Sequence, residues 1–182
     1  MPFTPYHFGP NGFIGLVFRK WLDLPVLVLA NVVVDIEVLI IGLFRLGHPY
    51  HRYCHTFLIG AGVGLFWGVA AYPLRHLFKW LMQIFRIPYE TSLRKMVISG
   101  ILGVWLHVLF DGIYHWDIRP FWPSRINPLY KMLIPLTRRR MDQNQLEAMC
   151  LAFFVASFIV YVIILILSYR SKAKQIGEKR HN

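Results

Sequence analysis

The sequence predicts an all-α integral membrane protein with about four transmembrane helices and a short N-terminal helix that is interfacial or re-entrant. Hydrophobic residues make up 56% of the 182 residues and charged residues only 16%, whereas about a quarter of a water-soluble domain is charged. The apolar residues gather in separate stretches of about 20 residues, and a helix of that length crosses a hydrocarbon core of about 30 Å. No stretch alternates at a period of two, which disfavours a β-barrel.

The N-terminal segment, residues 1–23, is rich in proline, glycine and aromatic residues and is too short to span a membrane. A short helix over Asn11–Trp21 would lie on the surface or enter partway and return. The predicted spans are Leu24–Phe44, Thr56–Leu74, Met96–Trp116 and Ala148–Tyr169. The second span is expected to continue past the interface to Trp80. We interpret residues 1–169 as one polytopic membrane domain and 170–182 as a basic C-terminal tail.

The net charge of +11 suggests nucleic acid, but the distribution of the basic residues excludes it. They lie between and after the apolar spans, as juxtamembrane anchors for anionic lipid headgroups do. A count of Lys and Arg gives 12 on the side of the termini and the 75–95 connection and eight on the other side, including Arg138–Arg140. The excess predicts cytoplasmic termini in a multi-pass protein. Membrane lipids, and other membrane protein subunits, are the expected partners.

Ionisable residues interrupt two of the apolar spans. Asp35 and Glu37 lie in the first span, and His107 and Asp111 lie in the third. A charged side chain at the centre of a span costs about 2.5–3.5 kcal/mol on insertion scales. A partner or a bound cation must therefore offset these costs.

The spacing and the order of the spans predict that these groups meet. His107, Asp111 and His115 follow one another at i, i+4 and i+8, which places them on one stripe of a helix. A second set, at i, i+3 and i+7, precedes the second span: His48, His51 and His55. The second span begins and the third span ends on the same side of the membrane. The polar groups should therefore converge in that half, with Asp35 the deepest.

Imidazole nitrogens and carboxylates in a low-dielectric cavity suit a divalent metal, Zn²⁺ first and Mn²⁺ or Fe²⁺ as alternatives. Four to six ligands also suit two metals bridged by water. The predicted ligands are Asp35, His51, His55, His107 and Asp111, with His7 or His115 completing the set. In a regular helix Asp35 and Glu37 point about 200° apart. Glu37 is therefore a candidate base, a group that supports a ligand, or a partner for Arg52.

These residues resemble a known family. The pattern comprises Thr4-Pro5-Tyr6-His7, the acidic pair Asp35-Ile36-Glu37, the run His51 to Thr56, the pair His107 and Asp111, and Trp122-Pro123. It is similar to the membrane-bound, metal-dependent hydrolase family, also called the LexA-binding, inner-membrane-associated hydrolases, over roughly residues 4–125. Two departures are Glu37, where the commoner pattern has Asp, and the i, i+4 spacing of His51 and His55.

The resemblance implies a bacterial inner-membrane hydrolase. The His-x-x-x-Asp helix is also similar, more distantly, to that of zinc-dependent phospholipase C and P1-type nucleases, which implies an amphiphilic phosphoester or lipid-like ester as the substrate. Such a metal lowers the pKa of a bound water toward about 7. Glu37 or a free carboxylate oxygen would accept the proton. Arg52, Arg119 or Arg125 would stabilise the developing anionic oxygen.

Other functions remain open at this point. Histidines on facing spans can ligate haem iron as in a b-type cytochrome. A polar cluster can be structural, in a non-catalytic subunit of a larger complex. A proton or ion pathway needs a polar file to both sides, which the wholly apolar last span disfavours. The two cysteines, Cys54 and Cys150, form no disulfide or zinc pattern.

Overall fold

A computed structural model describes residues 7–132 and 143–181, and the chain is all-α, as predicted. Three helices are long and apolar enough to cross a membrane, and a bent pair can make a fourth span. The elements are α1 (Phe8–Val17), α2 (Leu24–Leu43), α3 (Phe57–Ala70), η2 (Tyr72–Leu74), α4 (Arg75–Ile84), α5 (Leu93–Tyr114), α6 (Leu129–Met132) and α8 (Gln143–His181). Arg138–Arg140 lie outside the described residues.

Polar residues cap the helices that enter the bilayer. The carboxylate of Asp23 accepts a hydrogen bond from the Val26 amide, and Thr56 and Ser92 do the same for α3 and α5. Each cap satisfies an amide that lacks a partner within the helix. The starts of α2, α3 and α5 are therefore set by the polar residues that separate the apolar stretches.

The second predicted span is bent. It continues past the interface as expected, but α3 ends at Ala70 and the chain turns by 42° through η2 into α4. Pro73 lies in η2 and lacks the amide that a continuous helix needs. The face of α4 that carries Phe78 and Met82 is buried, while Lys79 is exposed, which is the pattern of a helix at the membrane surface.

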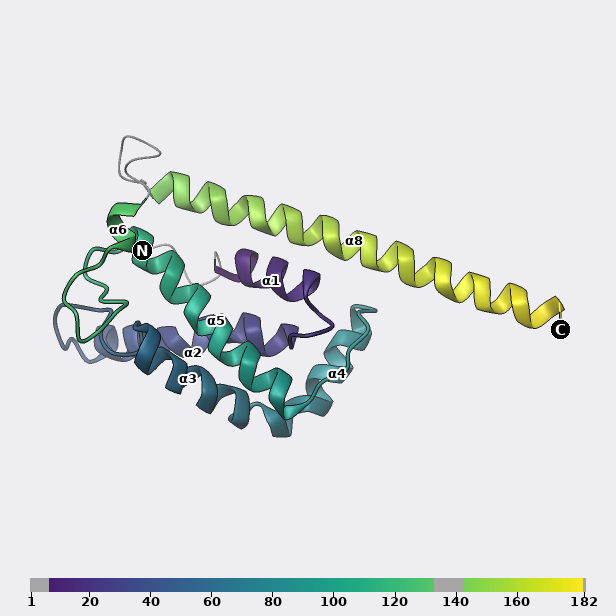
Figure 1. Cartoon of the computed structure of the whole chain (residues 1–182), viewed down its shortest axis with the longest axis horizontal. Helices are drawn as coiled ribbons and strands as arrows, with labels where there is room; N and C mark the ends of the chain where they lie inside the picture. Colours follow the sequence, from purple (N-terminus) through teal and green to yellow (C-terminus); the bar gives the residue numbers. More distant parts are fainter. Residues whose placement is uncertain (1–6, 133–142, 182) are drawn as a thin grey trace.

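The centre of the bundle is the close packing of α3 against α5, with α2 beside α5 (Figure 1). Gly60, Gly64 and Gly68 form a stripe along α3. A Cβ placed on Gly64 would lie 2.6 Å from the carbonyl oxygen of Gly100, so only glycine permits this approach. Small residues at helix contacts are typical of membrane bundles.

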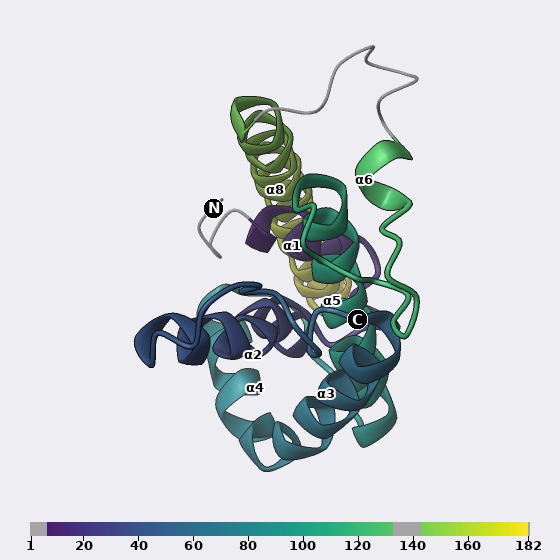
Figure 2. The ribbon, with the colours of Figure 1, turned by 90° about the vertical axis from the view of Figure 1, so that its left-hand side faces the viewer.

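The N-terminal helix α1 lies between α8 and the rest of the bundle (Figure 2). It begins at Phe8, three residues earlier than predicted, and runs from inside the bundle to the turn before α2. The Ser157 hydroxyl of α8 donates a hydrogen bond to the Gly9 carbonyl at 3.1 Å. Helix α1 thus folds back against α2 and α8.

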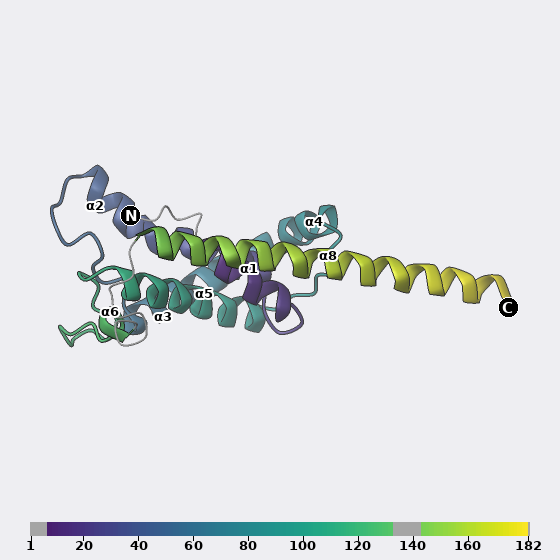
Figure 3. The ribbon, with the colours of Figure 1, turned by 90° about the horizontal axis from the view of Figure 1, so that it is seen from above.

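Helix α8 lies at the edge of the bundle and extends beyond it (Figure 3). In the most apolar stretch of this helix, within Glu147–Arg170, only 11% of the residues are buried in the protein. This fits the lipid-facing role expected for the last span. The helix passes residue 170 without a break and continues to His181. The predicted tail is therefore a continuation of the helix along its described backbone.

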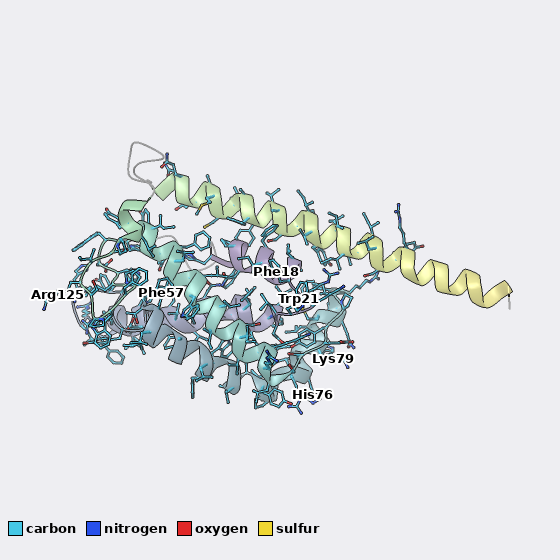
Figure 4. The ribbon with its side chains drawn as sticks, viewed as in Figure 1. Phe18, Trp21, Phe57, His76, Lys79 and Arg125 are labelled. Atoms are coloured by element: carbon cyan, nitrogen blue, oxygen red, sulfur yellow. The ribbon has the colours of Figure 1, made fainter. Side chains whose placement is uncertain are left out.

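The molecule has two distinct ends. The turn with Phe18 and Trp21 and the helix with His76 and Lys79 lie at one end, and Arg125 lies at the other (Figure 4). We call these the α4 end and the loop end. The loop end contains the connections 44–56 and 115–128.

Candidate metal centre

Four segments bring the predicted polar groups together near the loop end. Asp35 comes from α2, His51 and His55 from the loop before α3, and His107 and Asp111 from α5. The three histidines and Asp111 are each at most 4% exposed. His7, directly before α1, is 2% exposed and lies beside Asp111. The order of the spans predicts that these groups converge, and the structure brings them together.

The ligand atoms are spaced as they would be around one cation. One atom from each of Asp35, His55, His107 and Asp111 lies within 4.8 Å of the others. The His107 Nε2 is 3.2 Å from the Asp35 Oδ1 and 3.1 Å from the Asp111 Oδ2. The His55 Nε2 is 3.4 Å from the Asp35 Oδ1. Ligands about 2.0–2.1 Å from a tetrahedral Zn²⁺ lie about 3.3 Å from each other.

These close atoms are not aligned as hydrogen bonds. Within the described residues, the Nε2 atoms of His55 and His107 and the Oδ1 of Asp111 are buried and have no hydrogen-bond partner. The atoms point at a shared space rather than at one another. Buried polar atoms of a native protein rarely stay unsatisfied. A cation in that space would satisfy all of them.

Partners on the opposite side of each ring explain this orientation. The Nδ1 of His55 lies 3.1 Å from the Glu37 Oε2, and the Nδ1 of His107 lies 3.1 Å from the Asn31 Oδ1. An oxygen acceptor there favours a proton on Nδ1 and turns Nε2 toward the shared space, where the neutral ring can bind a metal. This is the arrangement that holds histidines in metal sites.

His51 has the same kind of support. Its Nδ1 lies 3.1 Å from the Asp117 Oδ2, and its Nε2 lies 3.8 Å from the Asp111 Oδ2. Burial raises the pKa of Asp117, but the hydrogen bond with His51 and the electrostatic attraction of His51 and His115 together outweigh it, so the net pKa is lowered and the carboxylate stays ionised. His51, Asp111 and His115 form a second group that could hold a metal. Asp111 is common to both groups, as in a site with two metals.

His115 directly follows α5, and its ring centroid lies 4.4 Å from that of His51. Burial lowers the pKa of His115 to about 4, so its ring is neutral at physiological pH and able to ligate. The His7 Nε2 lies 3.1 Å from the Asp111 Oδ1. This contact is possible only if the N-terminal segment folds back into the bundle, and α1 does so.

Glu37 supports the loop rather than facing the shared space. Its carboxylate accepts hydrogen bonds from the amides of Arg52, Tyr53 and Cys54 and pairs with the His55 ring. Because α2 is unbroken, Asp35 and Glu37 point in different directions, as the 200° offset predicts. Of the three predicted roles, this geometry favours the one in which Glu37 supports a ligand.

Arg52 is held by its own loop. Its guanidinium donates to the carbonyl oxygens of Pro49, Leu46 and Gly47 at 2.9–3.3 Å. Its contact with Glu37 runs through the backbone amide, not through the predicted side-chain ion pair. Several of the guanidinium N–H groups are therefore used to hold the connection 44–56 in its conformation.

A cavity of about 350 Å³ adjoins the cluster at the loop end, and His51 lines both. Arg52 and Arg119 are in its wall. Arg125, the third arginine considered, is not among the lining residues. The cavity thus places positive charge beside the cluster, where an anionic group could enter.

Sequence reasoning missed Asn31 and Asp117. Asn31 is fully buried in the first span, four residues before Asp35 and on the same face. An amide in the middle of an apolar span was therefore a usable signal. Asp117 lies two residues after His115 and gave no such signal, because a carboxylate in a loop is ordinary.

The haem hypothesis loses support, and Cys54 offers no reactive thiolate beside the cluster. The rings of His7, His51, His55 and His107 lie with neighbouring centroids 4.6–5.5 Å apart, which leaves no slot for a porphyrin between them. Burial raises the pKa of the Cys54 thiol to about 11, so it is not a thiolate at neutral pH.

The chain thus has the helices of a multi-pass membrane protein and a buried His/Asp cluster that could hold a metal. Comparison with protein-family models, with curated proteins and with solved structures finds no match.

Proposed function

We propose that this protein is a membrane-embedded, metal-dependent hydrolase that acts on a phosphoester or lipid-like ester. The observation that carries the proposal is the orientation of the three supported histidines. Each directs Nε2 toward the carboxylates of Asp35 and Asp111 while an oxygen acceptor holds Nδ1. Oxygen acceptors on Nδ1 hold histidines in this orientation in metal sites, and here Nε2 and the carboxylate oxygens lie at the spacing of metal ligands.

The residues that would hold the metal are Asp35, His55, His107 and Asp111, with His51, His115 and His7 available for a second ion. A Zn²⁺ bound there, or Mn²⁺ or Fe²⁺, would supply a nucleophile by lowering the pKa of water toward about 7. A carboxylate oxygen of Asp111 would accept the proton, and its Oδ1 lies 3.1 Å from the His7 Nε2, which could pass the proton on.

The substrate would enter at the cavity of the loop end. Arg52 and Arg119 offer guanidinium groups for an anionic oxygen there. The loop end borders the membrane surface, so an amphiphilic substrate could present its polar group to the cavity while its tail stays in the bilayer. The distant resemblance of the His-x-x-x-Asp helix to that of zinc-dependent phospholipase C and P1-type nucleases supports a phosphoester.

Metal analysis of purified protein tests the proposal. Wild type should retain a divalent metal, while His107→Ala and Asp111→Ala should lose it, and His76→Ala, on α4 at the other end of the molecule, should retain it. Hydrolysis of a chromogenic phosphodiester should follow the metal content. Unchanged metal in both cluster variants would refute the ligand assignment. Absence of metal with stoichiometric co-purification of other membrane proteins would favour the non-catalytic subunit.

A further inference from the structure

A second cavity lies at the α4 end, away from the metal centre. It has a volume of about 800 Å³ and lies between the end of α4, the turn that follows it and α8. Figure 3 shows α4 beside α8, and the Tyr161 hydroxyl joins them by donating to the Phe85 carbonyl at 3.1 Å. The proposed hydrolase makes no use of this region.

Two arginines line this cavity, Arg86 from the turn and Arg170 from the end of the α8 span. The other lining residues are apolar or uncharged. Within the described residues, neither arginine forms an ion pair and no acidic residue is in the wall. The cavity therefore offers two guanidinium groups to an anion at the level where α8 leaves the membrane.

Arg86 occupies a backbone position that favours glycine. Its φ is +55°, in the left-handed region, and its amide donates to the Gln83 carbonyl while the Ile87 amide donates to Met82. This hydrogen-bonding pattern ends α4, and glycine is the usual residue there. An arginine at this position is less stable than glycine would be, so its charge calls for another reason.

An apolar slot adjoins the cavity. It has a volume of about 420 Å³ and shares Ile87 with the cavity. Its walls come from α1, α2, α4 and α8 and include Phe8, Leu29, Met82 and Phe154. From Phe154 to Tyr161 the slot follows α8 for about 10 Å, and the cavity continues along α8 from Leu165 to Arg170. An acyl chain can therefore lie along α8 with its headgroup beside Arg170.

We propose that the cavity and the slot bind one anionic phospholipid. Its phosphate lies between Arg86 and Arg170, and one acyl chain lies in the slot between α1, α2 and α8. The charge of the cavity selects an acidic headgroup, and the apolar slot selects a long chain over free phosphate. The site is independent of the metal centre and of the hydrolysis proposed there.

Thermal unfolding of the full-length protein in a neutral detergent tests this proposal. Phosphatidylglycerol should raise the Tm, whereas phosphatidylcholine with the same acyl chains and sodium phosphate should not. Each arginine near an anionic surface is worth roughly a fivefold change in affinity. Arg86→Gly should therefore weaken phosphatidylglycerol binding by about fivefold, and the double variant with Arg170→Gln by about thirtyfold.

Arg86→Gly suits the backbone, so its protein without lipid should unfold at the wild-type Tm or above. Lys79→Gln removes one charge at the same end and should leave phosphatidylglycerol affinity unchanged. Three results would overturn the proposal: equal stabilisation by both lipids, a response to sodium phosphate alone, or unchanged affinity in the double variant.

Gly12→Leu tests the slot. A Cβ on Gly12 meets only the Ser157 hydroxyl, at 3.6 Å, so the added side chain fills the slot without a backbone clash. The variant should lose the preference for long-chain over short-chain phosphatidylglycerol. An unchanged chain-length preference would contradict an acyl chain in the slot.

Discussion

Two buried carboxylate clusters at opposite ends of the bundle have different chemistry. At the α4 end, Asp23 is 1% exposed and accepts hydrogen bonds from the Val26 amide, the Tyr89 hydroxyl and the Thr91 hydroxyl. Every one of these partners is a donor. The negative charge is therefore satisfied within the protein, and the cluster ties the turn before α2 to the chain before α5.

At the loop end, Asp111 is 3% exposed, yet it faces atoms of the opposite kind. The Asn31 Oδ1 accepts a hydrogen bond from the His107 Nδ1, which turns the His107 Nε2 toward the Asp111 carboxylate at 3.1 Å. Burial alone therefore does not identify a functional carboxylate. The kind of partner does, since Asp23 is surrounded by hydrogen-bond donors while Asp111 faces histidine rings that are held as metal ligands are.

The sharpest contrast comes from matched substitutions in the two clusters. Asp111→Asn should abolish metal binding and leave the metal-free protein at least as stable as wild type, because it removes an unsatisfied charge. Asp23→Asn should keep the metal but lower the free energy of unfolding by about 1–3 kcal/mol, since it weakens a satisfied network. Metal analysis and denaturant unfolding measure both. Identical behaviour of the two variants would remove the distinction.

Metal removal should destabilise only the loop-end cluster. A metal held at about 100 times its Kd stabilises the native state by about 2.7 kcal/mol. Treatment of wild type with a chelator should remove that amount and lower the Tm, and Zn²⁺ should restore it. Asp111→Asn should show no response to the chelator. A wild-type Tm that ignores both chelator and Zn²⁺ would contradict a metal in this cluster.

The residues behind the histidines should tune affinity without abolishing binding. Asn31→Leu removes the acceptor from the His107 Nδ1 and should weaken metal binding by about 10–100-fold. Isothermal titration of the metal-free protein with Zn²⁺ measures the change. Trp67→Phe is the control, because the Trp67 indole donates a hydrogen bond to the Val26 carbonyl and so contacts α2 away from the histidines. Equal effects of both variants would point to general loosening of α2.

The smallest expected effect is at the α4 end and depends on pH. Burial first, and then the Asp23 carboxylate, raise the pKa of Tyr89 above its usual value near 10. The unfolded chain therefore loses this proton above about pH 10 while the folded chain keeps it. Stability should be full below that pH and should fall as the pH rises. In Tyr89→Phe the free energy of unfolding should fall less between about pH 9 and about pH 11 than in wild type. An equal fall in the variant would contradict a role of Tyr89 in this pH dependence.

Hydropathy was enough to predict the fold class and the positions of the spans, because lipid forces backbone groups into helices. The bend at Pro73 and the continuation of α8 to His181 could not be predicted from hydropathy. Proline only makes a break possible, and a charged sequence can extend a helix outside the bilayer. Neither outcome follows from apolar length alone.

The candidate site was predictable to the extent that the order of the spans determines it. Asp35, His55, His107 and Asp111 stand out because polar residues are rare in apolar spans. The partners Asn31 and Asp117 contact histidines 76 and 66 residues away in sequence. The first pairing depends on how α2 and α5 rotate against each other, and the second on how the connections 44–56 and 115–128 fold together, which no local spacing encodes. The role of Glu37 was left open for the same reason.

X-ray absorption at the metal edge of the Zn²⁺-loaded protein tests the central claim most directly. The account predicts nitrogen and oxygen ligands at about 2.0–2.1 Å with the outer-shell scattering of imidazole rings, and loss of that imidazole signal in His107→Ala. A sulfur shell at about 2.3 Å, or a spectrum without imidazole scattering, would contradict a metal held between Asp35, His55, His107 and Asp111.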